Sequence, residues 1–416
     1  MSIVNIVSAI GNNSSVYPLL VRDCGIENPA KVVLTYNQNA KESRKMAWHA
    51  ARERFIDEYG SSAIWLGGIP AVEFLANKFI KRKGFNPAIN PKLFKEQPNQ
   101  GLEYNIKNFA QKAPEAVADL VKVKNNKKTY EKLLSSKFVL ATAIPALLMG
   151  VVLPKLNFKY TAKKMQESNE NKSKINYDTL DLSYGKNFVK KSTSKDVNFK
   201  GVSSVLSNMT QVQKMAVTDG GLTVGRVATG RTKNEKIEMG FKMVAMMFVN
   251  FVTPSYIQKG LDGLSSKLFG TNVTLDPAII ANKKFLTEIK NNTLALPKDN
   301  VIEFIDNNPK STFTELSKKF CKVKFLENSN IRDPRYYVEE EKIKALSNSI
   351  KNFANDAKNS GDIKKYASKA LKIKSFNILS NIVISSLLLA VGIPKAQFVL
   401  RKIISGTDID PGLLAK

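Results

Sequence analysis

The stretch SFNILSNIVISSLLLAVGIP, residues 375–394, has no charged side chain and stands between Lys374 and Lys395. A helix needs about 20 residues to cross roughly 30 Å of hydrocarbon. This stretch meets that length without help from its flanks. It therefore predicts an apolar helix that is long enough to enter a membrane.

Three shorter uncharged runs resemble it: YGSSAIWLGGIPAV (59–72), FVLATAIPALLMGVVLP (138–154) and MVAMMFVNFVTPSYIQ (243–258). All four runs contain proline, which interrupts the hydrogen bonds of a helix and is tolerated in membranes where neighbours satisfy the freed carbonyl. After three of the prolines, a phenylalanine follows four residues later and the chain becomes basic and amphipathic, which indicates a weak internal repeat. We expect helix kinks at Pro70, Pro145, Pro154, Pro254 and Pro394.

The predicted fold class is mainly α: a helical membrane-associated protein with up to four Pro-broken hydrophobic helices and amphipathic basic helices between them. The clearest strand pattern, KVVLTY at 31–36, stands nearly alone. Residues 165–200 are polar and read as a linker. The expected organisation is an N-terminal arm and charged helix (1–58), a first hydrophobic pair (59–164), a polar linker (165–215) and a second hydrophobic pair (216–416).

A net charge of +28, carried mostly by lysine, favours a polyanionic partner such as an anionic bilayer or nucleic acid. The competing interpretation is a Lys-rich composition whose charges are simply solvated. Arginine, which bidentate base recognition prefers, is scarce, so lipid is the simpler partner and nucleic acid the less favoured one.

The regions between the apolar runs are all rich in lysine, whereas a protein that spans a membrane several times concentrates lysine and arginine on one side. This favours apolar segments that dip into the membrane and return, with the basic loops on the cytoplasmic side. The alternative is a soluble helical protein whose core helices lack charge.

Two further helices follow from local patterns. Residues 38–58 read as a charged helix in which Arg54 and Glu58 pair at i, i+4. A second helix is predicted to begin with Asp333 as its N-cap and Pro334 at its first position. Its apolar face packs in the core or contacts another helical protein; the face consists of Ile343, Leu346, Ile350, Phe353 and Ala357.

No catalytic constellation stands out. GRVATGRT (225–232) departs from the phosphate-binding loop pattern because Arg231 replaces the lysine, so it reads as a basic loop. His49, Glu53 and Asp57 share one helix face but are too few for a metal site. The two cysteines have no metal-ligand spacing and favour a reducing compartment. We therefore expect no cofactor, no metal and no enzymatic activity.

The leading functional hypothesis is a membrane-associated structural or interaction protein, integral or peripheral, that binds an anionic bilayer. The alternatives are a soluble basic protein that binds a polyanion and, more weakly, a small transporter or channel, since Pro-interrupted helices in two halves are typical of transporters. Against transport, the apolar segments carry no central charge. The residues expected to contact the membrane or an anion are Lys78, Lys81, Arg82, Lys83, Lys155, Arg226, Arg231, Lys395, Arg401 and Lys402.

Overall fold

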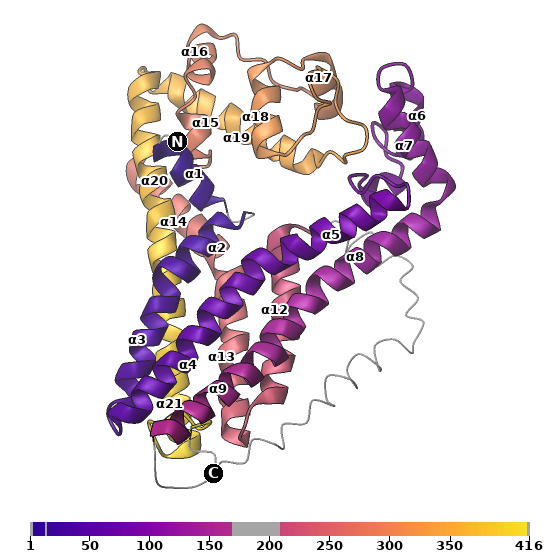
Figure 1. The fold of residues 1–416 in the computed structure, drawn as a ribbon. Coiled ribbons are helices and arrows are strands. Elements are labelled where there is room, and N and C mark those ends of the chain that lie inside the picture. Colours follow the sequence, from indigo (N-terminus) through magenta and orange to yellow (C-terminus); the bar gives the residue numbers. More distant parts are fainter. Residues whose placement is uncertain (1–2, 13–14, 169–208, 414–416) are drawn as a thin grey trace.

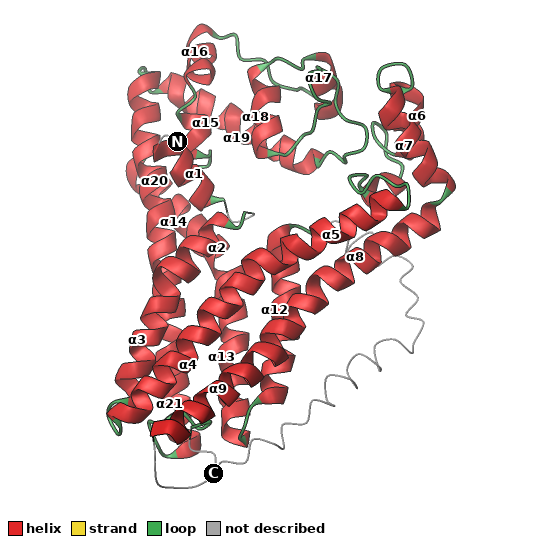
Figure 2. Cartoon of the chain, in the orientation of Figure 1, coloured by secondary structure: helices red, strands yellow, loops and turns green. Residues whose placement is uncertain are grey.

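The computed structural model describes residues 3–12, 15–168 and 209–413, and the described chain is mainly helical, with no strand in it (Figures 1 and 2). The predicted fold class is confirmed. The strand pattern at 31–36 is wrong, because these residues belong to helix α3 (Asn28–Asn39). There Lys31 and Thr35, four positions apart, both face inward, so the period of the buried face is that of a helix.

A bundle of long helices forms the body of the molecule (Figure 1). Its helices are α1 (Ile3–Gly11), α2 (Tyr17–Arg22), α3, α4 (Arg44–Ala63), α5 (Ile69–Arg82), α8 (Lys127–Leu147), α9 (Leu153–Ser168), α12 (Gln211–Thr229), α13 (Lys233–Phe251), α14 (Thr253–Phe269), α20 (Ile363–Leu387) and α21 (Ile393–Ser405).

Three helical runs in this bundle are long and apolar enough to cross a membrane, by length and composition: Arg44–Arg82, Lys127–Met165 and Ile363–Ser405. Each contains one of the predicted apolar segments and runs through it without reversing direction (Figure 1). The helices do not reverse inside these segments, and the expectation that the segments dip into a membrane and return stays a prediction. The fourth predicted segment is divided at Val252 between α13 and α14.

At four prolines of the bundle the helix continues because a π-helical turn precedes the proline. These turns are η1 (Asp23–Glu27), η2 (Ile64–Gly68), η4 (Leu148–Val152) and η5 (Leu388–Gly392), which lie two residues before Pro29, Pro70, Pro154 and Pro394. A proline lacks an N–H and its ring crowds the carbonyl four residues back. The wider turn removes the conflict: the residue before the proline donates to the carbonyl five residues back, as Leu153 does to Leu148.

The other two predicted kink residues behave differently. Pro145 lies inside α8, and Pro254 lies in the first turn of α14, after the break at Val252. For all five prolines, a bend of the helix axis stays a prediction.

The internal repeat is visible in the third long helix of each half of the chain. Residues 141–152 and 381–392, which are 240 positions apart, have the same succession of buried and exposed side chains. Pro154, Lys155 and Phe158 recur at the same offset as Pro394, Lys395 and Phe398. Two of the three occurrences of the sequence pattern thus correspond to equivalent places in the fold, whereas the third, at Pro70 and Phe74, lies in α5.

Packing extends this equivalence to a first half (α2–α9) and a second half (α12–α21). In the first half α4 packs on α9 and α5 packs on α8; in the second half α13 packs on α21 and α14 packs on α20. Across the halves, α8 packs on α12, and α20 packs on α2. Of the predicted linker at 165–215, residues 169–208 lie outside the described part.

Each half carries an insertion between its second and third long helices, at the same end of the bundle (Figure 1). The first insertion holds η3 (Pro91–Phe94), α6 (Leu102–Phe109) and α7 (Pro114–Asn125). The second holds α15 (Pro277–Ile280), α16 (Lys283–Asn291), α17 (Val301–Asn307), α18 (Thr312–Phe320) and α19 (Glu340–Asn359).

Helix α19 carries the predicted apolar face, which is buried against α16, α17 and α18 within the chain, with Leu346 only partly covered. The same face as a contact for another helical protein stays a prediction. The predicted start of this helix is wrong, because α19 begins at Glu340. Asp333 instead accepts hydrogen bonds from the backbone N–H and the guanidinium of Arg335, which holds the preceding segment in a turn.

We expect Phe353→Ala to lower the free energy of unfolding by about 3–5 kcal/mol, because the ring is fully buried and packs on Phe285 and Tyr366. Thermal unfolding of the purified chain measures this loss. Its neighbour Asn352 is exposed, so Asn352→Ala is the matched control and should change little. An equal loss of unfolding free energy in the two variants would contradict the burial of Phe353 in the core of the second insertion.

Candidate functional site: a charged cavity between the two halves

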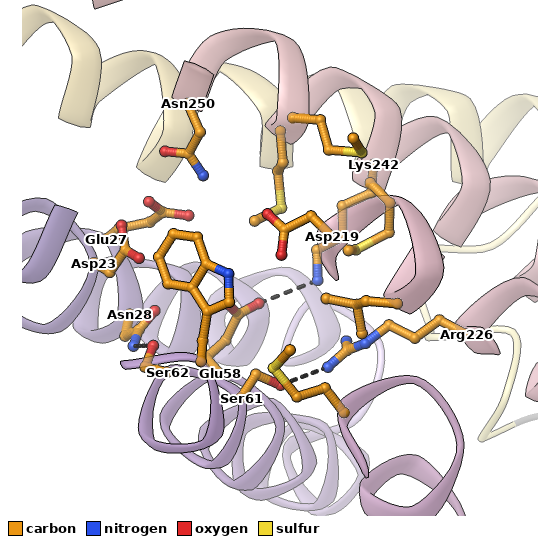
Figure 3. Close-up of a pocket in the computed structure, with 16 residues that line it drawn as sticks. Asp23, Glu27, Asn28, Glu58, Ser61, Ser62, Asp219, Arg226, Lys242 and Asn250 are labelled. Carbon is orange, nitrogen blue, oxygen red and sulfur yellow. Dashed lines mark hydrogen bonds and ion pairs between the residues drawn. The ribbon is translucent and has the colours of Figure 1, made fainter. Parts of the chain in front are cut away.

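A small cavity lies inside the bundle, between η1, α3, α4, η2 and η4 of the first half and α12 and α13 of the second (Figure 3). Its volume is about 60 Å³, which is room for a few water molecules. Trp65 and several methionines form part of its wall. Its charged and amide-bearing lining residues are Asp23, Glu27, Asn28, Glu58, Asp219, Arg226, Lys242 and Asn250.

The first-half wall comes from a helix that turns its charges inward. Arg22, Asp23, Glu27 and Lys31 are all buried, although they lie on the continuous run α2–η1–α3. The exposed side chains of the same run are uncharged. This is the reverse of a helix on the surface of a water-soluble protein, whose charges face outward.

Glu58 of α4 connects the basic side chains around the cavity. Its carboxylate lies 3.0 Å from Arg54, 3.1 Å from Lys242 and 3.5 Å from Lys31. Lys31 also contacts Glu27 one turn before it. Removing a charge from water is costly unless a partner of opposite sign is close, and Glu58 provides such a partner for Arg54, Lys242 and Lys31.

Four ion pairs in the described part of the helical bundle join the two halves, and their polarity is uniform; Lys92–Glu339 and Arg335–Asp119 also join the halves, between the insertions, and Lys92–Glu339 has the reverse polarity. In the four pairs of the bundle, the carboxylates all come from α4 and α5, and the bases all come from α12, α13 and the turn between them. The pairs are Glu53–Arg231, Asp57–Arg226, Glu58–Lys242 and Glu73–Lys214. The cavity beside Trp65 lies between the first three pairs and the last one along α4–α5. The half-to-half contact is therefore electrostatically complementary on both sides of the cavity.

Several oxygen atoms of the cavity lack a partner. Asp23 Oδ1, Glu27 Oε2 and Asn250 Oδ1 are buried and accept no hydrogen bond from the described residues. The carboxylate of Asp219 also forms no ion pair or hydrogen bond within the described chain. Figure 3 shows Asp219 between the side chains of the two halves. Unsatisfied buried acceptors are costly, so these atoms call for a donor or a cation.

A second buried cluster lies at the end of the bundle that is opposite the insertions. Arg401 of α21 donates to both carboxylate oxygens of Glu238, at 3.1 Å and 2.6 Å. Arg231 lies between Glu53 and Glu235 and stacks 4.0 Å from the centre of the Phe158 ring. These contacts tie α4, α9, α13 and α21 together.

The C-terminal segment closes this cluster with Asp410, which lies 3.3 Å from Arg401. Burial acts to raise the pKa of the Asp410 carboxyl, but Arg401 and Arg231 outweigh it and hold the pKa below its usual value. Asp410 is therefore ionised at neutral pH and balances the two guanidiniums.

The ten predicted contact residues differ in how far their side chains are exposed. Arg226, Arg231 and Arg401 have buried side chains in the ion pairs described above. Lys155 is half-buried. The others are exposed, and their contact with a membrane or an anion stays a prediction; they are Lys78, Lys81, Arg82, Lys83, Lys395 and Lys402.

Sequence reasoning missed the acidic side of the cavity. Asp23, Glu27 and Lys31 repeat every four residues in a run whose other face is uncharged, and this spacing was the available signal. The stretch 225–232 was also misread as a loop: α12 continues to Thr229, so Arg226 lies on its inner face. A metal site is a separate matter, since no group of three or more His, Cys, Asp or Glu in the described ranges is placed to hold a metal.

Comparison with known proteins gives this site no precedent: no protein-family model matches the chain, and neither a curated protein nor a solved structure is similar to it.

Proposed function

We propose that the chain is an integral membrane protein with a structural or interaction role, whose helical bundle lies in the bilayer and whose lysines hold anionic lipid headgroups. The observation that carries this proposal is the inverted distribution of charge. Charged side chains pair inside the bundle, while the outside of the same helices is apolar.

The outer face can be followed helix by helix between successive exposed lysines. On α13–α14, the exposed residues between Lys236 and Lys259 are Ile237, Phe241, Val244, Phe248, Val252, Ser255 and Tyr256. On α20–α21, those between Lys372 and Lys395 are Phe376, Leu379, Val383, Ile384, Leu387, Leu388 and Gly392. We call this uncharged outer surface the apolar belt. Contiguous exposed apolar surfaces on proteins mark sites of contact with other proteins or with membranes.

The length of the belt matches a bilayer. Positions 236 to 259 and positions 372 to 395 each span about 35 Å at 1.5 Å per residue. The hydrocarbon of a bilayer is roughly 30 Å thick. Lysine side chains at both ends reach the headgroups by extending along their aliphatic stems. This supports crossing rather than lying on the surface.

Lysines mark both ends of the belt on four helical runs. At the end nearest the insertions they are Lys78, Lys132, Lys259 and Lys372, and at the other end they are Lys45, Lys159, Lys236 and Lys395. Headgroups of anionic lipids attract such residues by about 1 kcal/mol each. That most of the basic loops lie on the cytoplasmic side of the membrane is a further part of the proposal.

Membrane fractionation followed by an alkaline carbonate wash tests the proposal. Retention of the chain in the washed pellet is the expected result, because carbonate removes proteins held only by charge. Release by the wash would reduce the proposal to a peripheral protein. Recovery in the soluble fraction, with binding to nucleic acid that weakens steeply with salt, would replace it with the polyanion-binding alternative.

A second candidate function is transport of a small charged solute, and the cavity is the observation that favours it. Buried ionisable groups between two equivalent halves, beside helices interrupted at proline, are the usual setting of a transport site. The sequence argument against transport considered only the apolar segments, whereas the charges come from the helices packed beside them. Flux of Na⁺, K⁺ or protons into vesicles that contain the chain, above that into empty vesicles, is the measurement.

A further inference from the structure

The unpartnered groups of the central cavity are mainly acceptors. Asp23 and Glu27 come from the first half, and Asp219 and Asn250 come from the second. Asp23, Glu27 and Asn250 are each more than nine-tenths buried, and each turns an oxygen without a hydrogen-bond donor to the cavity they line. Three of the four carry a carboxylate.

Most of the basic side chains near these oxygens already form ion pairs or hydrogen bonds with other groups. Lys31 and Lys242 are committed to Glu27 and Glu58, and Arg226 is committed to Asp57 and Ser61. Asp219 faces Glu27, which carries the same charge, as well as Arg226. Arg22 is the base beside Asp23, but the two form no hydrogen bond in the structure. The cavity therefore holds more negative charge than its own bases pair directly.

We propose that the cavity binds one monovalent cation, a proton or a hydrated alkali ion, at Asp219, with the oxygens of Asp23, Glu27 and Asn250 as acceptors that are reached through water. Carboxylate and amide oxygens, completed by water, are the ligands that hard cations prefer. The volume of about 60 Å³ admits a small ion with water and excludes a large organic cation. No three carboxylates of the described residues are placed to hold a metal ion directly. An alkali ion at Asp219 would therefore keep part of its water shell, and a divalent ion, which needs several carboxylate ligands, does not fit.

The site takes residues from both halves. A bound cation would therefore link the two halves at the cavity, between the ion pairs that already link them on either side of it. This inference deepens the proposed transport function. The role of the bound cation, as the transported or coupling ion, rests on that proposal. Binding is measured separately from transport and from membrane insertion. A chain that resists carbonate but binds no cation would remove this inference alone.

The test for an alkali ion is thermal unfolding of the full chain in detergent, at constant ionic strength, in the chloride salts of Na⁺, K⁺ or choline. A ligand that binds only the folded state raises its melting temperature. We expect Na⁺ or K⁺ to raise it by at least about 2 °C over choline. The rise should disappear in Asp219→Asn and persist in Asp362→Asn, which changes an exposed carboxylate at the start of α20.

The test for a proton uses the wild-type chain, so it does not depend on a variant that folds. Dicyclohexylcarbodiimide reacts with protonated carboxyl groups in apolar surroundings. Peptide mass spectrometry should find the label at Asp219, Asp23 or Glu27, and labelling should fall as the pH rises. Protection of these residues by Na⁺ or K⁺ would identify the alkali ion as the ligand that competes with the proton. Absence of both the alkali effect and the label would overturn the proposal.

Discussion

Replacing Arg401 by alanine is expected to lower the free energy of unfolding by about 3–5 kcal/mol, because it leaves the Glu238 carboxylate buried without its partner. The Arg401 side chain is 1% exposed and makes three hydrogen bonds to Glu238. It also lies 5.3 Å from the centre of the Phe398 ring and contacts Asp410. Thermal unfolding in detergent measures the effect as a lower melting temperature.

The neighbouring residue provides the control. The Lys402 side chain is 69% exposed and lies 3.9 Å from Asp408, a contact of the kind that contributes at most about 1 kcal/mol. Lys402→Ala should therefore leave stability nearly unchanged while weakening attraction to anionic vesicles. If Arg401→Ala instead reduced vesicle binding and left stability intact, the buried ion pair would be refuted and Arg401 would be a surface contact.

Placing a charge on the apolar belt is the second large effect. Val244→Asp should sharply reduce the amount of chain retained in carbonate-washed membranes, because aspartate near the centre of a membrane helix costs roughly 2.5–3.5 kcal/mol. In water, the same change at an exposed position would cost within about 0.5 kcal/mol. The two environments thus predict different outcomes for one substitution.

Val399 is a matched position outside the belt. Val244 and Val399 are both 62% exposed, but Val399 lies between the exposed residues Lys395 and Lys402. Val399→Asp should be tolerated, since a charge at the headgroup level costs little. Similar membrane retention of the two variants would mean that the belt does not face lipid.

Much of the architecture could be predicted from local patterns. The uncharged run at 375–394 identified the core of the longest candidate membrane span, and the interval from Pro154 to Phe158, repeated at Pro394, indicated a weak internal repeat. The Arg54–Glu58 pair followed from helical spacing and forms at 3.0 Å. These features depend on residues that are close in sequence.

The cavity could not be predicted in this way, because its parts are far apart in the chain. Glu58 meets Lys242, and Asp57 meets Arg226, only after the two halves pack together. Arg231 and Arg401 looked like surface bases next to an apolar run, and nothing near them in the sequence shows the carboxylates of Glu53 and Glu238. The π-helical turns before Pro29, Pro70, Pro154 and Pro394 could not be predicted either, because proline in the sequence indicates only a break in helical hydrogen bonding.

The central claim, that the bundle crosses the bilayer, is tested most directly by a water-soluble maleimide on single cysteines along α20–α21. The parent is Cys24→Ser with Cys321→Ser, and the probed variants are Lys372→Cys, Val383→Cys and Lys395→Cys in native membranes. All three positions are exposed on the helix surface. We predict labelling of the first and third and none of Val383→Cys until detergent is added. Equal labelling of all three in intact membranes would contradict the account.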